Sequence, residues 1–279
     1  MHQGTCTQGP ATPFCGSFRS IPHFILLIGT LAWTCAQPAH ASLFVSLSNN
    51  STTLSCDNST AGGVTSCGTL GFTTTLNSNS IGFTGSVGGY FVSNFNLGAN
   101  APGTPVLGDA LDSVFNVQHP TGTGLLTVDF ATYNMSAPSG PGLLLSGAQT
   151  AAWTVSTAGD YQTFQVWARP DNQPIVPGGG VGGATLPMTT CTSPGAPPVL
   201  SCSQPASPQT TPFTKTGNYA LTGQEIISEA IGSQGNFTGQ VDALAPVPEP
   251  VTPILLAGGL LGMALMARRK QAKPRATAL

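Results

Sequence analysis

The side chains best suited to acid–base chemistry in this sequence are two glutamates four residues apart. Glu225 and Glu229 lie in a stretch from Thr222 to Gly232 that has the spacing of a helix capping box and glycine at its end. Paired carboxylates are the groups that hydrolyse glycosides. The same residues fit an exposed surface helix better, and a strand is almost as good an interpretation. We therefore predict no catalytic role for the pair.

One histidine lies between Ser42 and Pro248. His119 stands beside Pro120, and a lone histidine is more often a structural or surface residue than a catalytic base. The segment has no Gly-x-Ser-x-Gly elbow, no His-Glu-x-x-His motif and no phosphate-binding loop. We predict that the protein is not an enzyme and that it uses no cofactor.

Oxygen ligands of the kind that calcium prefers are grouped along one stretch. Asp109 and Asp112 lie near Asn100 and Asn116. Their spacing matches no calcium loop, so we expect solvated acids and predict no metal site.

Three aromatic residues, Trp153, Tyr161 and Trp167, lie close together in the sequence. Aromatic faces can stack on sugars, and packing in a sandwich core explains the same residues more simply.

Charge is scarce and unevenly distributed. Only 6% of the residues are charged, against about 25% in a typical soluble protein. Between Ser42 and Pro248 there are two basic and nine acidic residues, which gives this segment a net charge of −7. Nucleic-acid binding needs a basic face that neutralises phosphates, so we exclude a nucleic-acid partner.

Four cysteines lie beyond residue 41, and their spacing suggests two disulfides. Cys56 and Cys67 are separated by ten residues, and so are Cys191 and Cys202. These two pairings are the obvious choice, although four cysteines allow three connectivities. A zinc site would need closer ligand pairs or histidines.

The N-terminus has the features of a secretory signal peptide over residues 1–41. Arg19 precedes an apolar run from Ile21 to Trp33, and Ala39-His40-Ala41 is a small-x-small cleavage site. A retained N-terminal anchor is the alternative.

The C-terminus combines three features in a fixed order. The tetrapeptide Val247-Pro248-Glu249-Pro250 precedes an uncharged apolar span, residues 251–267, which ends at Arg268-Arg269-Lys270. As a helix, the span reaches about 25 Å, and snorkelling of the basic cluster extends it toward the hydrocarbon thickness. We predict a single transmembrane helix with residues 268–279 as a basic cytoplasmic tail.

This tail resembles the PEP-CTERM sorting signal of exosortase substrates. The resemblance covers about Val247 to the end of the chain and implies a Gram-negative cell that exports the protein. It also implies transient anchoring in the inner membrane and processing near Pro248-Glu249-Pro250 by an exosortase, a membrane-embedded cysteine peptidase. The two prolines keep the motif extended, as a peptidase substrate must be. An ordinary anchor with a Pro-rich stalk is the alternative.

Alternating apolar residues between the two ends predict an all-β ectodomain over residues 42–240. Leu126, Val128 and Phe130 are an example, and turn residues separate several such runs. We expect an antiparallel β-sandwich or jelly-roll-like ectodomain, followed by the single transmembrane helix. A Pro/Gly-rich loop or insertion is predicted over 170–212, and a stalk over 241–250.

The sequence thus predicts an exported, disulfide-bonded structural protein of the cell surface or extracellular matrix. The resemblance links such proteins to exopolysaccharide and biofilms, so exopolysaccharide and other matrix proteins are the expected partners. A carbohydrate-binding module is the second interpretation, and a secreted glycoside hydrolase is the third.

Overall fold

The computed structural model describes residues 42–246 apart from 51, 101, 175, 179, 181–182 and 196–200, together with Met263. For 111–115 and 205–209 only the backbone is described. Within these residues the chain forms two antiparallel sheets and one helix. The predicted signal peptide, sorting motif, transmembrane span and basic tail lie outside the described residues, Met263 excepted. No helix among the described residues is long and apolar enough to cross a bilayer.

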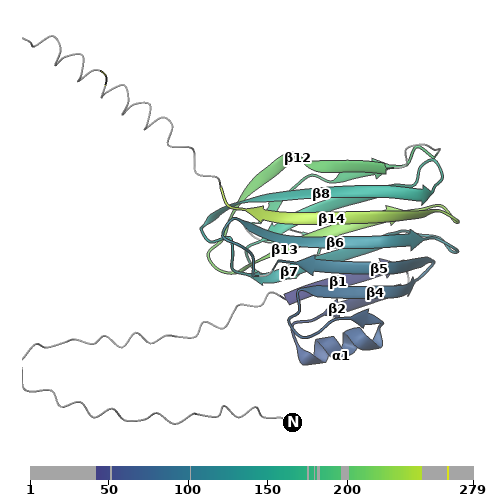
Figure 1. Cartoon of the computed structure of the whole chain (residues 1–279), viewed down its shortest axis with the longest axis horizontal. Helices are drawn as coiled ribbons and strands as arrows, with labels where there is room; N and C mark the ends of the chain where they lie inside the picture. The colour runs from purple at the N-terminus through teal and green to yellow at the C-terminus, as the bar shows by residue number, and fades with distance from the viewer. Residues whose placement is uncertain are drawn as a thin grey trace, which may run out of the picture. The chain divides into compact units, whose positions relative to one another are not determined.

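The two sheets face each other as the layers of a sandwich (Figure 1). The first sheet has the order β10-β9-β13-β7-β1-β2, with β11 also paired to β9. The second has the order β12-β8-β14-β6-β5-β4-β3. The strands of the first sheet are β1 (Ser42–Asn49), β2 (Thr52–Asp57), β7 (Leu126–Met135), β9 (Tyr161–Arg169), β10 (Ala184–Thr185), β11 (Thr189–Thr192) and β13 (Tyr219–Ser228). Those of the second are β3 (Phe72–Thr73), β4 (Ser80–Val87), β5 (Tyr90–Ala99), β6 (Leu107–Gln118), β8 (Gly142–Val155), β12 (Ser201–Thr214) and β14 (Gln234–Leu244). The predicted all-β class is confirmed.

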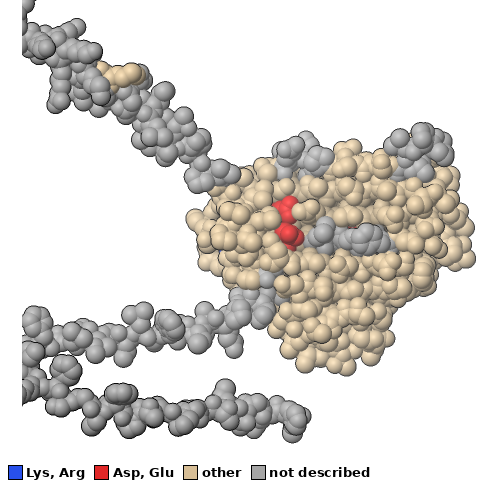
Figure 2. Space-filling view, in the orientation of Figure 1, with Lys and Arg blue, Asp and Glu red and all other residues tan. Residues whose placement is uncertain are grey.

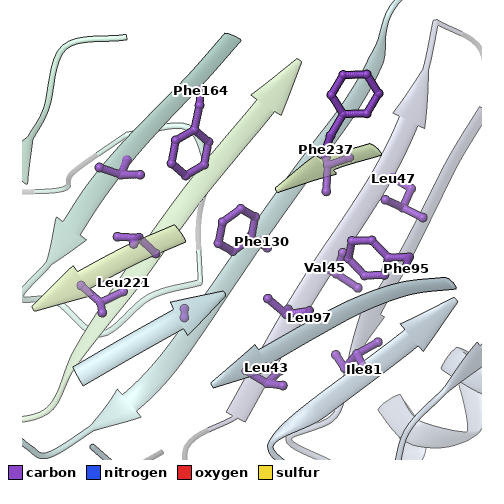
Figure 3. Close-up of a cluster of buried hydrophobic side chains, with 14 of the residues drawn as sticks. Leu43, Val45, Leu47, Ile81, Phe95, Leu97, Phe130, Phe164, Leu221 and Phe237 are labelled. Atoms are coloured by element: carbon purple, nitrogen blue, oxygen red, sulfur yellow. The ribbon is translucent and has the colours of Figure 1, made fainter. Parts of the chain in front are cut away.

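Period-two alternation builds the core between the sheets. In β1, Leu43, Val45 and Leu47 are fully buried, and the residues between them are partly exposed. These side chains lie near Phe95 and Leu97 of β5 across the sandwich (Figure 3). Burial of each such side chain contributes about 1.5–3 kcal/mol, so the hydrophobic pattern fixes which face of a strand points inward.

Glycines in central strands make room for aromatic rings. A Cβ on Gly223 of β13 would overlap the ring of Phe130. One on Gly239 of β14 would lie 2.6 Å from the Phe164 ring. The two phenylalanine rings stack on each other 6.2 Å apart. Part of the high glycine content is therefore a packing requirement of the core.

The Gly239→Ala substitution should lower the free energy of unfolding by about 1–3 kcal/mol, because the new methyl group overpacks against Phe164. Gly142→Ala, at the exposed start of β8 with nothing within 4 Å, is the matched control and should change stability by less than about 0.5 kcal/mol. Urea denaturation of both variants measures this, and equal midpoints would contradict the packing role.

Asparagine supplies left-handed backbone at three strand irregularities. Asn94, Asn116 and Asn134 have φ values of 57°, 55° and 64°. They coincide with shifts of register between β4 and β5, β6 and β14, and β7 and β13. Asparagine tolerates this conformation better than other side-chain-bearing residues, so it suits a bulge.

Two disulfides join elements at opposite edges of the sandwich. Cys56 of β2 is bonded to Cys67 of the helix α1 (Ala61–Thr69), which begins where Thr60 Oγ1 accepts a 3.0 Å hydrogen bond from the Gly63 N–H. Cys191 of β11 is bonded to Cys202 of β12. The second bond links the two sheets directly, since β11 pairs with β9 and β12 with β8. The predicted pairing is the one that the structure contains.

The prediction of a loop or insertion over 170–212 is wrong in part. β10, β11 and most of β12 fall within this region. β12 is an edge strand whose Pro205 and Pro212 lie opposite Ala148 and Leu144 of β8. An edge strand tolerates proline because its outward side has no ladder bond to lose. Its proline content therefore marks an edge instead of a loop.

Two further boundaries differ from the prediction. The stretch from Thr222 is part of strand β13, not a helix, so the strand alternative is correct. The predicted stalk from residue 241 begins too early, because β14 continues to Leu244, with Val241 and Ala243 fully buried. In both segments, buried and partly exposed residues alternate with the period of two that a strand has.

Both ends of the folded domain lie at the same end of the sandwich. Ser42 pairs with Tyr133 near the end of β7, and Leu244 pairs with Leu144 near the start of β8. The connection 136–141 joins these two strands. We call this the terminal end, and the opposite end, which carries the β6–β7, β8–β9 and β13–β14 connections, the loop end (Figure 1).

Candidate functional site

A cluster of buried ionisable residues lies at the loop end. His119 follows β6, Asp160 precedes β9, and Glu229 follows β13. Each is at most 4% exposed. Strands that all terminate at the same end of the sandwich bring these residues together from distant parts of the sequence.

The ring of His119 is held on two sides. Its Nδ1 hydrogen-bonds the backbone carbonyl of Glu229, and since a carbonyl oxygen only accepts, Nδ1 carries the proton. The ring stacks on Tyr90 with centroids 4.2 Å apart and planes 4° apart. Nε2 is buried and has no hydrogen-bond partner among the described residues.

Tyr90 links the connections of the loop end. Its hydroxyl donates to the Gly124 carbonyl at 3.0 Å and accepts from the Glu229 N–H at 3.3 Å. Burial, the largest influence, raises the pKa of this phenol to about 12. Tyr90 is thus a neutral hydrogen-bonding bridge at any physiological pH.

Asp160 fastens the β8–β9 connection to the β13–β14 turn. One carboxylate oxygen accepts from the Thr157 N–H at 2.8 Å and from the Ser233 hydroxyl at 2.6 Å. The other accepts from the Ala230 N–H at 2.7 Å. These three short hydrogen bonds hold the two loops together.

Glu229 has the opposite environment. Neither of its carboxyl oxygens has a hydrogen-bond partner among the described residues. Burial raises its pKa to about 8, and the charge of Asp160 adds to the rise. Its side chain lies against Gly235, where a Cβ would come within 3.2 Å of Oε1. At neutral pH, Glu229 is therefore mostly a neutral acid inside the domain.

A hollow of about 190 Å³ opens beside this cluster. Its lining includes His119, Pro120 and Ser233. That volume holds a few water molecules. The arrangement can bind water or a small polar group at His119 and can store a proton on Glu229.

The glutamate pair considered from the sequence is not exposed. Glu225 is fully buried and faces the core, where the Gln162 amide donates to its Oε1. Glu229 lies four residues further along at the end of the same strand. The expectation of a solvent-exposed surface helix is wrong, because alternate residues of β13 point between the sheets. Carboxyls in these positions do not flank a surface where a sugar could lie.

The residues considered for calcium are used elsewhere. Asn100 closes a turn: its Oδ1 accepts from the Asp109 N–H at 2.9 Å. Asn116 lies at a bulge of β6, where its Oδ1 accepts from the side-chain amide of Gln234. Asp112 lies in the part of β6 whose side chains are not described. Among the described residues, no group of three or more acidic, histidine or cysteine side chains could hold a metal ion.

The aromatic residues considered for sugar stacking are mostly internal. Trp153 and Trp167 are 4% and 5% exposed, and Trp153 packs edge-on against Phe237. Tyr161 is half-buried. Core packing accounts for Trp153, whereas Trp167 is buried on the opposite face of β9 from the core residues Phe164 and Val166.

Sequence reasoning singled out His119 and Glu229 separately but missed that they form a cluster with Tyr90, Asp160 and Ser233 at the loop end. Tyr90 begins β5, Asp160 lies in the β8–β9 connection and Ser233 in the β13–β14 connection, and no local motif unites them. Asp160 had one usable signal, its position three residues after Thr157 in a Gly-containing turn.

Comparison of the chain with known protein families, with curated proteins and with solved structures finds no match.

Proposed function

We propose that this chain is an exported surface or matrix protein that is sorted by its C-terminal PEP-CTERM-like signal and acts by contact, without turnover. The observation that carries the proposal is where the fold begins and ends. Strand β1 begins at Ser42, directly after the predicted cleavage at Ala41. Strand β14 ends at Leu244, three residues before Val247. Processing at both predicted sites would release an intact sandwich.

The disulfides support an extracellular destination. Disulfides persist in oxidising compartments and are rare in the cytosol. Both bonds lie within the segment between the two predicted processing sites.

The surface supports a contact role. On the face formed by the second sheet, acidic atoms form one small patch and the other described atoms belong to neutral residues (Figure 2). Asp109 and Asp242 are cross-strand neighbours in this sheet. Burial raises the pKa of Asp242 to about 6, and the neighbouring Asp109 adds to the rise. A surface with few charged groups suits contact with a hydrated polysaccharide.

The strand order supports the jelly-roll form of the sandwich. From β6 onward the chain forms β6-β14-β8-β12 in one sheet and β7-β13-β9-β10 in the other. Two Greek keys wound together produce this order, and lectin domains use the same architecture. The comparison with lectins is an analogy of fold, and the ligand must be argued from a site.

Replacing Pro248-Glu249-Pro250 with three alanines tests the sorting proposal. In cells that contain the matching exosortase, we expect the wild-type protein to lose the apolar span and the basic cluster. The alanine variant should stay larger and in the membrane fraction, because the peptidase no longer recognises an extended Pro-Glu-Pro segment.

Pro246→Ala is the matched control, since it removes a proline outside the motif and should be processed normally. Intact mass and fractionation report the result. The same mass and location for the wild-type protein and the triple-alanine variant would refute the proposal.

A further inference from the structure

The terminal end carries a second, larger pocket, of about 410 Å³. It lies between the β7–β8 connection and the β12–β13 connection. Its polar lining includes Ser136, Ser139, Lys215, Thr216 and Asn218. The volume is within the range of small-molecule sites.

Lys215 is fixed in this pocket by contacts to both connections. Its Nζ donates to the Ser136 carbonyl at 3.0 Å and lies 4.7 Å from the centroid of the Tyr219 ring. The Tyr219 hydroxyl in turn donates to the Ala137 carbonyl at 2.7 Å, which holds the ring in place. The position of the ammonium group is therefore set before any ligand arrives.

The charge of Lys215 has no carboxylate partner among the described residues. The ion pair of that part of the chain joins the other cation, Arg169, to Asp171 at 2.7 Å. Lys215 is only 9% exposed, and burial lowers the pKa of its ammonium. A buried charge is costly unless it is paired, and the Ser136 carbonyl takes only one of the three donors that an ammonium group carries.

We propose that this pocket binds the carboxylate of an acidic sugar unit, a uronate, within a polysaccharide. The ammonium group of Lys215 pairs with the carboxylate, and the side chains of Ser139, Thr216 and Asn218 hydrogen-bond the sugar hydroxyls. The inference rests on the proposed function for the source of the polysaccharide.

The lining favours a sugar over an acidic peptide. Hydroxyl and amide side chains from exposed positions surround the ammonium group. Peptide recognition relies on apolar anchor pockets, on strand addition or, for acidic motifs, on clusters of arginines, and the lining of this pocket offers one cation and mainly small polar groups.

The test uses the full-length chain purified in detergent and three polymers: polygalacturonate, neutral dextran and polyglutamate. Calorimetric titration should show binding to polygalacturonate that weakens as salt is raised, and at least tenfold weaker binding to the other two. Lys215→Met should weaken polygalacturonate binding at least tenfold.

A second pair of variants avoids any effect on folding. Asn218→Asp and Ile231→Asp each add one negative charge at an exposed position, the first beside Lys215 and the second at the loop end. Only Asn218→Asp should weaken binding. Equal affinity of the two variants, no binding to polygalacturonate, or equal binding of polyglutamate would overturn the proposal. These outcomes are independent of tail processing, so the site and the sorting proposal can fail separately.

Discussion

Raising the pH from 5 to 8 should cost the wild-type protein up to about 4 kcal/mol of unfolding free energy through Glu229. The carboxyl of this residue ionises near pH 4.5 in the unfolded chain and near pH 8 in the folded protein. Between these values the unfolded chain binds fewer protons, so stability falls as the pH rises. The contribution of Glu229 to the free energy of unfolding is fully present below about pH 4.5, and it is lost above about pH 8.

Glu229→Gln should remove most of this dependence, because a buried amide keeps the shape of the neutral acid and cannot ionise. The variant should be less pH-sensitive and more stable than wild type at pH 8. The ionisable groups that surround the carboxyl, Tyr90, His119 and Asp160, are unchanged in the variant.

Asp242→Asn is the control. The carboxyl of Asp242 is half-buried on β14 and has a pKa raised to about 6. Its removal should therefore abolish only a smaller pH dependence of the free energy of unfolding, confined to pH values below about 6. Urea titrations at pH 5, 6, 7 and 8 distinguish the two variants. If the free energies of unfolding of Glu229→Gln and wild type fall in parallel as the pH rises, Glu229 is not a neutral buried acid.

Replacing both cysteines of either disulfide with alanine should lower stability by about 3 kcal/mol. In each bond the bonded residues are 11 apart in sequence. The chain-entropy model gives equal costs for loops of equal length. We therefore expect the Cys56/Cys67 and Cys191/Cys202 double variants to differ by less than about 1 kcal/mol, although only the second bond joins the two sheets.

Each double variant is the control for the other, and reduced wild-type protein should lose the sum of the two. Thermal unfolding with and without reductant measures the costs. A reductant that leaves the wild-type melting temperature unchanged would contradict the prediction.

The strands with strict alternation could be predicted from the sequence because burial on one face enforces period two. β1 and the segment 126–130 of β7 are examples, and Leu43, Val45 and Phe130 are core residues as that pattern requires. The Pro-containing β12 could not be predicted, since an edge strand has the composition of a loop. The stretch around Glu225 was ambiguous because polar residues on the inner face of β13 break the apolar repeat.

The candidate sites were beyond local reasoning for a different reason. Tyr90 and Glu229 are 139 residues apart, yet a backbone-to-hydroxyl hydrogen bond joins them. Lys215 carries no motif, and its significance appears only when no carboxylate is found beside it in the described part of the chain. Both sites arise where strands end, so the strand order had to be known first.

The position of β14 would have a mechanical consequence for the precursor while its predicted tail anchors it in a membrane. β14 pairs with β6 on one side and β8 on the other, and the chain continues from it toward the predicted sorting motif. Tension on the tail would run along the strand axis and load both hydrogen-bond ladders in shear, so that many bonds must break together. A strand at a sheet edge would instead share the load with one neighbour.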